Sequence, residues 1–348
     1  MSKISVAHGA GGLVMQGLVK QHILRYLGGS GAEVPLEALD DAAVVDGTVL
    51  KSDSHTVKPL FFPGGDIGRL SISGTVNDIA VMGAEPFALA AGFIIEEGLE
   101  ITDLDRILQS MTDTCREAGV FVVTGDTKVM ERGKIERFVV NTSGVGRRTS
   151  LLEQNLQEVR RYRELKSRWL LDSNLKRGDK IILSGAVGDH GVAVLASREG
   201  YGFASNITSD VRPLNKVIAS LLEIGGIVSM KDPTRGGLSN AVNEWSEKSR
   251  VGILLQEERI PIHEGVRSAC EMLGIDPLDI GNEGKIIIGI VPEKAEECLN
   301  RLRETEAGRE AELIGEVADD FREVVLETGV GGRRILPPPA GDPVPRIC

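Results

Sequence analysis

The stretch that decides the fold class is DIGRLSISGTVNDIAVMG, residues 66–83. Asp66 is a typical N-cap and Gly83 is typical of the position just after a helix, so the stretch predicts a helix over residues 66–82. Residues 44–52 before it and 87–95 after it have the composition of β-strands. This order of strand, helix and strand indicates mixed α and β structure.

The same alternation continues along the chain. Thr102 is expected to cap a second helix, whose apolar residues keep a 3.6-residue period as far as Gly119. Further strands are predicted at 120–124, 135–143, 180–183, 227–230, 251–255 and 286–291, with short strands near 312–317 and 324–326. Helices are predicted from Asp189, after Pro213, over 238–248, from Glu264 and from Pro292. The fold class is therefore α+β or α/β.

The length of the chain indicates more than one domain. A chain of 348 residues exceeds what one core usually supports, so two domains are expected. The predicted boundaries are an N-terminal α/β domain at 1–149, a charged linker helix at 150–176, a C-terminal α/β domain at 177–332 and a proline-rich mobile tail at 333–348. The linker has apolar residues at near-helical spacing, which favours an amphipathic helix on the surface. A helix that docks a partner is the alternative.

The composition excludes several classes of protein. A net charge of −11 and a pI near 5.1 argue against binding to nucleic acid or to an anionic membrane surface, which select for basic patches. The chain has no run of about 18 apolar residues, and its first twelve residues lack the hydrophobic region of a signal peptide. We therefore expect a cytoplasmic protein. The four cysteines form no CxxC pair, which argues against structural zinc and a disulfide framework.

The C-terminal end is rich in proline. Residues 336–347 contain five prolines, and Cys348 is the last residue. Because a proline-rich segment is semi-rigid, it could carry a thiol at its end into another site. The alternative is a disordered tail whose final cysteine is incidental, since chain ends are usually loose. Ile347 is the one residue of this segment that we expect to be buried.

The candidate chemistry lies in acidic and glycine-rich loops. Asp40 and Asp41 precede the first strand, Asp53 follows it, Asp78 ends the first helix, Asp126 follows a strand that we expect to be buried, and Asp232 opens DPTRGG. An aspartate at such a position is usually a turn former or a cap. Carboxylates distributed over several loops are also suitable ligands for Mg²⁺ that bridges protein and phosphate oxygens. The motif HGAGG at 8–12 suits a flexible cover for phosphates. Neither a Walker motif nor a dinucleotide-binding motif is present.

These motifs resemble those of the superfamily that includes aminoimidazole ribonucleotide synthetase, selenophosphate synthetase and thiamine-phosphate kinase. Within that superfamily, the chain is most similar to the HypE family of hydrogenase maturation factors. The resemblance is carried by HGAGG at 8–12, KSDSH at 51–55, VNDIAVMGA at 76–84, GDTKV at 125–129, GDHG at 188–191, DPTRGGL at 232–238, GNEG at 281–284 and PRIC at 345–348. These motifs occur in order over nearly the whole chain, so the resemblance is specific. The charged segment at 153–168 looks longer than the usual connection there.

The resemblance implies a fold and a reaction. The N-terminal domain is expected to form a homodimer through its sheet, with ATP and Mg²⁺ held between it and the C-terminal domain. HypE-like proteins convert a carbamoyl group, which HypF places on the terminal cysteine, into a thiocyanate that supplies cyanide for nickel-iron hydrogenase through the HypC–HypD complex. The resemblance thus implies an ATP-dependent carbamoyl dehydratase. A small-molecule kinase or synthetase of the same superfamily is the alternative, but it would have no use for Cys348.

The resemblance also implies three sets of site residues. The metal-binding set is Asp41, Asp78 and Asp232, with Asp53 and Asp126 as further ligands, and Asp40 could exchange roles with Asp41. The nucleotide-binding set is Gly9, Gly11, Gly12, Lys51, Asp53, His55, Asn77, Asp126, Thr127, Arg235 and Gly236. The catalytic set is Cys348, Lys128 as the cation that stabilises the transferring phosphoryl group or orients the amide oxygen, and Glu283 as the base for the amide proton or as a loop-stabilising or nucleotide-contacting acid. His190 is either a satisfied loop residue or a phosphate-binding one, and Arg346 is interpreted as a docking residue.

Overall fold

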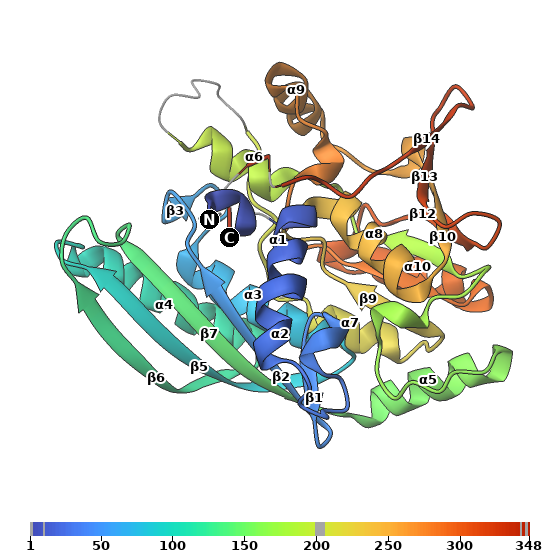
Figure 1. Ribbon diagram of the computed structural model, residues 1–348, viewed down its shortest axis with the longest axis horizontal. Helices are drawn as coiled ribbons and strands as arrows, with labels where there is room; N and C mark the ends of the chain where they lie inside the picture. The colour runs from blue at the N-terminus through green and yellow to red at the C-terminus, as the bar shows by residue number, and fades with distance from the viewer. Residues whose placement is uncertain (1–2, 10, 199–205, 342, 345–346) are drawn as a thin grey trace.

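The computed structural model describes residues 3–9, 11–198, 206–341, 343–344 and 347–348. Two sheets form its framework, one in each half of the chain (Figure 1). The N-terminal sheet has the strand order β1-β2-β7-β5-β6, and the C-terminal sheet has the order β14-β13-β10-β12-β8-β11-β9. A small hairpin, β3 (Phe61–Phe62) with β4 (Gly65–Asp66), precedes the first long helix. The predicted mixture of helices and strands is confirmed.

The N-terminal sheet is covered on one face by two helices. Its strands are β1 (Ala43–Val45), β2 (Thr48–His55), β5 (Glu85–Glu96), β6 (Phe121–Met130) and β7 (Phe138–Arg147). Helix α3 (Ile67–Val81) contacts β2 and β7 and packs against α4 (Ile101–Ala118). Every residue of α3 except Arg69 is buried, including polar residues such as Asn77 and Asp78. The carboxylate of Asp66 caps α3 by accepting from two backbone N–H groups, as the sequence predicts.

Two local predictions in this half are wrong. Helix α4 begins at Ile101 with Glu100 at its N-cap, so Thr102 lies inside the helix and does not cap it. The strand predicted at 120–124 continues to Met130, and its residues are exposed, not buried. Asp126 and Lys128 therefore lie within an edge strand and not in a loop after a buried one. The apolar composition of β6 suggested burial, but within one subunit nothing among the described residues covers it.

The N-terminal residues form a short series of helical turns. These are a 3-10 turn (Val6–Gly9), α1 (Gly12–Leu18), a π-helical turn (Val19–Ile23), α2 (Leu24–Leu27) and a second 3-10 turn (Leu36–Ala38). Gly12 lies against the C-terminal tail, where the Leu13 N–H donates to the carbonyl oxygen of Pro339 at 3.3 Å. The two ends of the chain thus meet on one side of the molecule (Figure 1).

The C-terminal half follows the predicted alternation closely. Its strands are β8 (Lys180–Leu183), β9 (Ile227–Lys231), β10 (Gly252–Gln256), β11 (Ile287–Ile290), β12 (Glu312–Ala318), β13 (Val324–Glu327) and β14 (Arg333–Ile335). Its helices are α6 (Asp189–Ala196), α7 (Asn215–Leu222), α8 (Gly237–Ser249), α9 (Glu264–Leu273) and α10 (Ala295–Arg303), with 3-10 turns at Asp172–Asn174, Glu257–Arg259, Pro277–Asp279, Pro292–Lys294 and Glu306–Gly308. The last strand, β14, is not predicted by the sequence. None of the described helices is long and apolar enough to cross a lipid bilayer.

The predicted linker segment is helical only in its first half, where the helix is amphipathic as predicted, with one buried face and one exposed face. Helix α5 (Ser150–Tyr162) ends midway, and Leu152, Leu156 and Trp169 are fully buried. The side chain of Asn155 donates to the carbonyl oxygen of Ile227 at 2.7 Å and accepts from its N–H at 2.8 Å. The side-chain amide of Asn155 thus satisfies both the N–H and the carbonyl group of Ile227 at the edge of the sheet, as a neighbouring strand would. The segment joins one hydrophobic cluster that contains residues of both halves of the chain.

The described part of the C-terminal tail packs against its own subunit. Residues 333–335 pair with β13, so the segment predicted to be mobile begins with a strand. Leu336 and Val344 are buried as well as Ile347, although the sequence predicts burial only for Ile347. Arg346 lies outside the described residues.

Candidate functional site

Three aspartates from distant parts of the chain meet at one point. Asp41 precedes β1, Asp78 lies in the last turns of α3, and Asp232 follows β9. Each offers a carboxylate oxygen, and these three oxygens lie within 4.8 Å of one another. We call these residues the carboxylate triad. The triad forms where α3 contacts both β2 of the N-terminal sheet and β9 of the C-terminal sheet.

Burial and mutual repulsion make this cluster unfavourable for three negative charges. Burial raises the pKa of Asp78 to about 7, and the charges of Asp53 and Asp41 add to this effect against the attraction of Lys51. Burial, Asp78 and Asp41 together raise the pKa of Asp232 well above its usual range. Burial also raises the pKa of Asp41, although Lys231 opposes the shift. A divalent cation would remove this repulsion.

Two lysines neutralise part of the charge. Lys51 Nζ lies 2.7 Å from a carboxylate oxygen of Asp78, and Lys231 Nζ lies 2.7 Å from one of Asp41. Lys231 also contacts Asp172 and Glu244, each at 3.1 Å. Its pKa is raised well above the usual value, because these carboxylates outweigh the effect of burial.

The donor set fits Mg²⁺ with a bound phosphate chain. All three triad ligands are carboxylate oxygens, which are the hard ligands that Mg²⁺ prefers. His55 is almost fully buried nearby, and both of its ring nitrogens lack a hydrogen-bond partner among the described residues. Its Nε2 is 3.6 Å from Asp53, which in turn contacts Arg235 at 3.4 Å. A buried ring without partners is expected where a ligand supplies them.

A cavity of about 230 Å³ opens beside the triad. The N-terminal turns and α8 form opposite walls. Its lining includes Gly11, Gly12, Lys51 and Arg235 of the predicted nucleotide-binding set, together with Asp41 and Asp232. Met15, Gln16, Val19 and Ala241 also line the cavity, and the sequence does not single them out. Gly236, also in the predicted nucleotide-binding set, is not among the lining residues; it caps α8 with a φ of 78° that suits glycine.

Other predicted nucleotide-binding residues lie apart from this cavity. Gly9 belongs to the first 3-10 turn and is not part of the lining. The side chain of Asn77 donates to the carbonyl oxygen of Arg212 and accepts from the N–H of Leu214. Asn77 thus ties α3 to the segment before α7.

Asp126, Thr127 and Lys128 are not brought to the triad within one subunit. Along the sheet, Asp53 pairs with Thr142, Thr142 pairs with Ala91, and Ala91 pairs with Gly125. Three strand spacings separate β2 from β6, which is about 14 Å. Because neighbouring residues of a strand point to opposite faces, Asp126 and Lys128 point away from the face that carries Asp53.

Asp40 and Asp41 have different surroundings. Asp40 accepts from the N–H of Asp172 at 3.0 Å and lies 3.8 Å from Lys248. Burial and the charge of Asp172 raise its pKa to about 6. Only Asp41 faces the other two triad members, so the geometry favours Asp41 as the ligand.

The last residue of the chain lies near Arg235. Arg235 has a raised pKa, first because of the nearby negative charge of Cys348 and then because of Asp53 and Glu283. Glu283 is buried, and its own pKa is raised well above the usual range by burial and by the charges of Asp232 and Asp53. The guanidinium of Arg235 thus interacts with the last residue of the chain and with the carboxylates of Asp53 and Glu283.

Comparisons with known proteins agree with this geometry. Residues 39–148 match the N-terminal domain of AIR synthase related proteins, and residues 176–327 match the C-terminal domain. Carbamoyl dehydratase HypE of Azotobacter vinelandii is 44% identical over 347 residues, which are 99% of this chain and 97% of that protein. This chain belongs to the HypE family. A crystal structure of a HypE–HypF complex has a TM-score of 0.83 at 42% identity, over 92% of this chain and 99% of that one. A HypE structure in complex with ATP has a TM-score of 0.79 at 39% identity, over 99% and 100% of the two chains.

Sequence reasoning missed the polar network behind the triad of this HypE family member. Asp172 is buried and accepts from Lys231 Nζ at 3.1 Å, Lys248 Nζ at 2.6 Å and Trp245 Nε1 at 3.0 Å. It therefore holds Lys231, which contacts the triad. The position of Lys231 directly before DPTRGG was a usable signal. No sequence signal indicated Asp172, which lies in the linker.

Proposed function

We propose that this chain uses ATP to dehydrate a carbamoyl group carried on the sulfur of Cys348, giving a thiocyanate. As a member of the HypE family, the chain is a carbamoyl dehydratase of hydrogenase maturation. The observation that carries the proposal is the position of the chain end: Ile347 is buried in its own subunit, and the negative charge of Cys348 acts on Arg235 beside Asp53 and Glu283. A protein that phosphorylates a free metabolite would have no reason to bring the end of its own chain there.

The chemistry requires activation of the carbamoyl oxygen. A thiocarbamate S–C(=O)–NH₂ does not lose water unaided, because hydroxide is a poor leaving group. Transfer of the γ-phosphoryl group of ATP to the carbamoyl oxygen, with loss of one N–H proton, gives S–C(OPO₃²⁻)=NH and ADP. Loss of the second N–H proton, with departure of phosphate as the C–O bond breaks, leaves S–C≡N. Each turnover thus removes the elements of water and converts one ATP to ADP and phosphate.

The residues of the site suit these steps. Arg235 and Lys51 are cations that would stabilise the carbamoyl and phosphoryl oxygens as negative charge develops. Glu283 would accept the N–H protons, since burial and neighbouring carboxylates raise its pKa toward that of a useful base. Asp41, Asp78 and Asp232 would hold Mg²⁺, which neutralises charge on the phosphate oxygens.

We also propose that the active unit is a homodimer formed through the N-terminal sheet. Phe121, Val123 and Val129 on the edge strand β6 are 71%, 67% and 69% exposed in the single subunit. An exposed apolar edge strand is a template for pairing with another chain. Asp126 and Lys128 lie on this strand, so dimerisation would bring them to the triad of the partner.

Two kinds of partner follow from the reaction. The carbamoyl group must be placed on Cys348 by a carbamoyltransferase, and a relative at 42% identity has been solved as a HypE–HypF complex. We propose HypF in this role here. The HypC–HypD complex is the proposed acceptor of the cyanide group.

The direct test is mass analysis of the C-terminal peptide after incubation with HypF, carbamoyl phosphate, ATP and Mg²⁺. We expect carbamoylation of Cys348 followed by loss of one water when ATP is present. Glu283→Gln should accumulate the carbamoylated form while still binding ATP. A carbamoylated wild-type chain that never loses water with ATP would refute the proposal.

Subunit mixing tests the placement of Lys128. Lys128→Met and Glu283→Gln subunits should each be inactive alone. In a mixed dimer one site contains both native residues if Lys128 acts across the interface, so mixing should restore part of the activity. No recovery would mean that Lys128 acts within its own subunit or not at all.

A further inference from the structure

The residue before the terminal cysteine occupies a closely fitted socket. Ile347 is 1% exposed and packs with Val344 in a cluster that includes Phe62, Val194 and Val211. Gly281 forms one wall, where an added Cβ would lie 2.6 Å from Ile347 Cδ1. The socket therefore combines the β3–β4 hairpin of the N-terminal half with segments of the C-terminal half.

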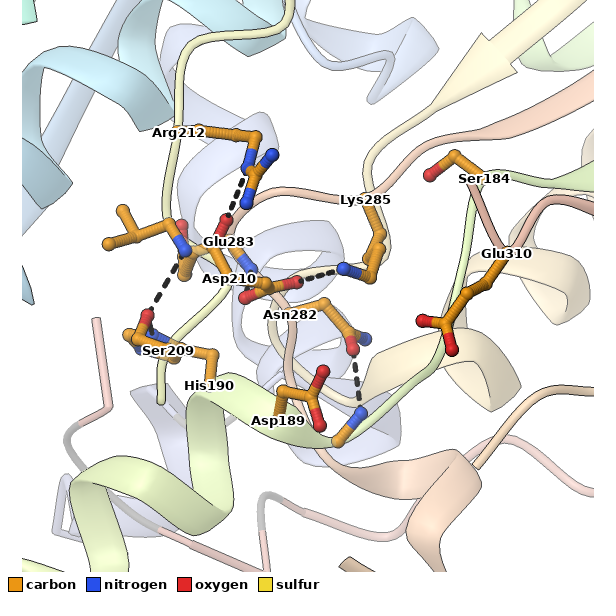
Figure 2. Close-up of polar contacts among 12 residues, drawn as sticks. Ser184, Asp189, His190, Ser209, Asp210, Arg212, Asn282, Glu283, Lys285 and Glu310 are labelled. Carbon is orange, nitrogen blue, oxygen red and sulfur yellow. Dashed lines mark hydrogen bonds and ion pairs between the residues drawn. The ribbon is translucent and has the colours of Figure 1, made fainter. Parts of the chain in front are cut away.

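A buried histidine contacts the tail backbone in this socket. The Nε2 atom of His190 lies 2.7 Å from the carbonyl oxygen of Ile347, and its Nδ1 atom lies 2.7 Å from Ser209 Oγ. Figure 2 shows His190 at the start of α6 beside Ser209. Neither atom faces the cavity beside the triad, because His190 is not among the residues that line it. The sequence interpretation of His190 as a phosphate-binding residue is therefore not supported.

The surrounding contacts determine which nitrogen of His190 carries the proton. A carbonyl oxygen can only accept, so Nε2 must carry the hydrogen in this contact. The Ser209 hydroxyl already accepts from the N–H of Val211 at 3.1 Å, which leaves its own hydrogen available for Nδ1. The ring of Phe62 packs edge-on against His190, with centroids 5.4 Å apart. His190 is thus held as a neutral ring with one N–H aimed at the tail.

Ser209 is itself fixed by the other half of the chain. Its N–H donates to the carbonyl oxygen of Pro63 at 2.7 Å, in the turn between β3 and β4. Gly64 in the same turn leaves no room for a Cβ against Ser209. Ser209, which contacts Nδ1 of His190, therefore holds the imidazole ring from the side opposite the tail.

We propose that His190 is the anchor of the C-terminal tail and that it positions the Cys348 sulfur by holding the carbonyl of Ile347. That carbonyl carbon is bonded directly to the nitrogen of Cys348. Once it is fixed, few bond rotations remain between the anchor and the sulfur, so the reach of the thiol toward Arg235 is defined. Because the contact is to backbone, it would persist when the sulfur carries a carbamoyl group. This inference rests on the proposed reaction at Cys348.

Two matched substitutions separate anchoring from packing. Glutamine places an N–H near the position of Nε2 in histidine, whereas asparagine places one near Nδ1. His190→Gln should retain the contact to Ile347, and His190→Asn should lose it. One hydrogen bond contributes enough to change the population of the docked tail about fivefold. Ile347→Ala should loosen the tail through the apolar side of the socket.

The readout is the accessibility of the chain end. Cys115, Cys270 and Cys298 are buried, so a thiol reagent applied to the folded protein should modify Cys348 first. We expect His190→Asn and Ile347→Ala to be labelled about fivefold faster than wild type, and His190→Gln to resemble wild type. Release of Cys348 by a carboxypeptidase should follow the same order. Thermal unfolding identifies any variant that fails to fold. If a His190 variant does not fold, the labelling of Ile347→Ala is the remaining test of tail docking.

The outcomes distinguish this inference from the proposed function. If neither His190→Asn nor Ile347→Ala changes labelling or carboxypeptidase release, the anchor is refuted even when wild type forms thiocyanate. Equal effects of His190→Asn and His190→Gln would also refute the hydrogen-bond role of His190. If labelling follows the expected order but carbamoylated wild type is not dehydrated by ATP, the anchor stands and the proposed reaction fails.

Discussion

Asp172 is the residue whose replacement should most clearly destabilise the region behind the triad. Its carboxylate is 2% exposed and accepts from Lys231, Lys248 and Trp245. Asp172→Asn keeps the shape but removes the charge. Lys231 retains Asp41 and Glu244, whereas Lys248 retains the carbonyl oxygen of Leu39 and, as its remaining carboxylate, the more distant Asp40.

The magnitude follows from the cost of leaving a buried cation without its partner. Removing one member of a buried pair typically costs about 3–5 kcal/mol. Since Asn can still accept from Trp245 and Lys231 keeps two carboxylates, we expect the lower end, about 3 kcal/mol. For a domain of this size that lowers Tm by about 6–12 °C. Arg177 and Asp319 form an exposed pair at 3.2 Å and supply the control, because Asp319→Asn should cost less than about 1 kcal/mol.

The assay is thermal and denaturant unfolding of both variants at several pH values. Burial opposes ionisation of Asp172, but Lys231 and Lys248 outweigh it and lower its pKa in the folded chain. A lowered carboxyl pKa contributes stability that is present above the unfolded value near 4 and is lost as the pH falls through the folded value. The gap between wild type and Asp172→Asn should therefore persist from pH 5 to 8 and close in acid. A gap below about 1 kcal/mol at pH 7 would contradict this account.

Three other outcomes are expected. Asp66→Ala should cost about 1 kcal/mol in unfolding experiments, because Asp66 caps two backbone N–H groups of α3; an unchanged Tm would argue against the cap. Burial lowers the pKa of His263, but Asp189 and Glu310 outweigh it and raise the pKa. Wild type should therefore be slightly more stable than His263→Gln at low pH and should lose this advantage as the pH rises past about 6.5 and through the raised pKa. Stability curves of the two proteins that stay parallel over this pH range would contradict the interaction of His263 with Asp189 and Glu310. Mg²⁺ with a non-hydrolysable ATP analogue should raise the Tm of wild type but not of Asp78→Asn, and an equal rise in both would mean that the triad does not hold the metal.

Local patterns predicted most of the elements correctly. The helix at 66–82 and the strands at 180–183 and 227–230 follow from residue types within a few positions, since periodicity and capping are local properties. The wrong predictions concern segments whose burial depends on tertiary packing. Residues 120–124 look like a buried strand in composition, yet they belong to a longer strand, 121–130, that forms an exposed edge of the sheet. The linker looks like a surface helix, yet Trp169 lies in the core.

The amino-acid sequence by itself determined the class of fold, and its family resemblance singled out Asp41, Asp78 and Asp232, which the fold brings together. The metal that they would hold and the reaction at the terminal cysteine are proposals. The fold class follows from residue type, order and spacing. Only the tertiary structure decided three contacts: Lys231 pairs with Asp41 across 190 positions of the chain, Asp172 accepts a hydrogen bond from the same lysine, and His190 contacts the backbone carbonyl next to Cys348. Such contacts depend on which buried polar groups are left to satisfy one another once the two sheets have packed, and no local pattern encodes that.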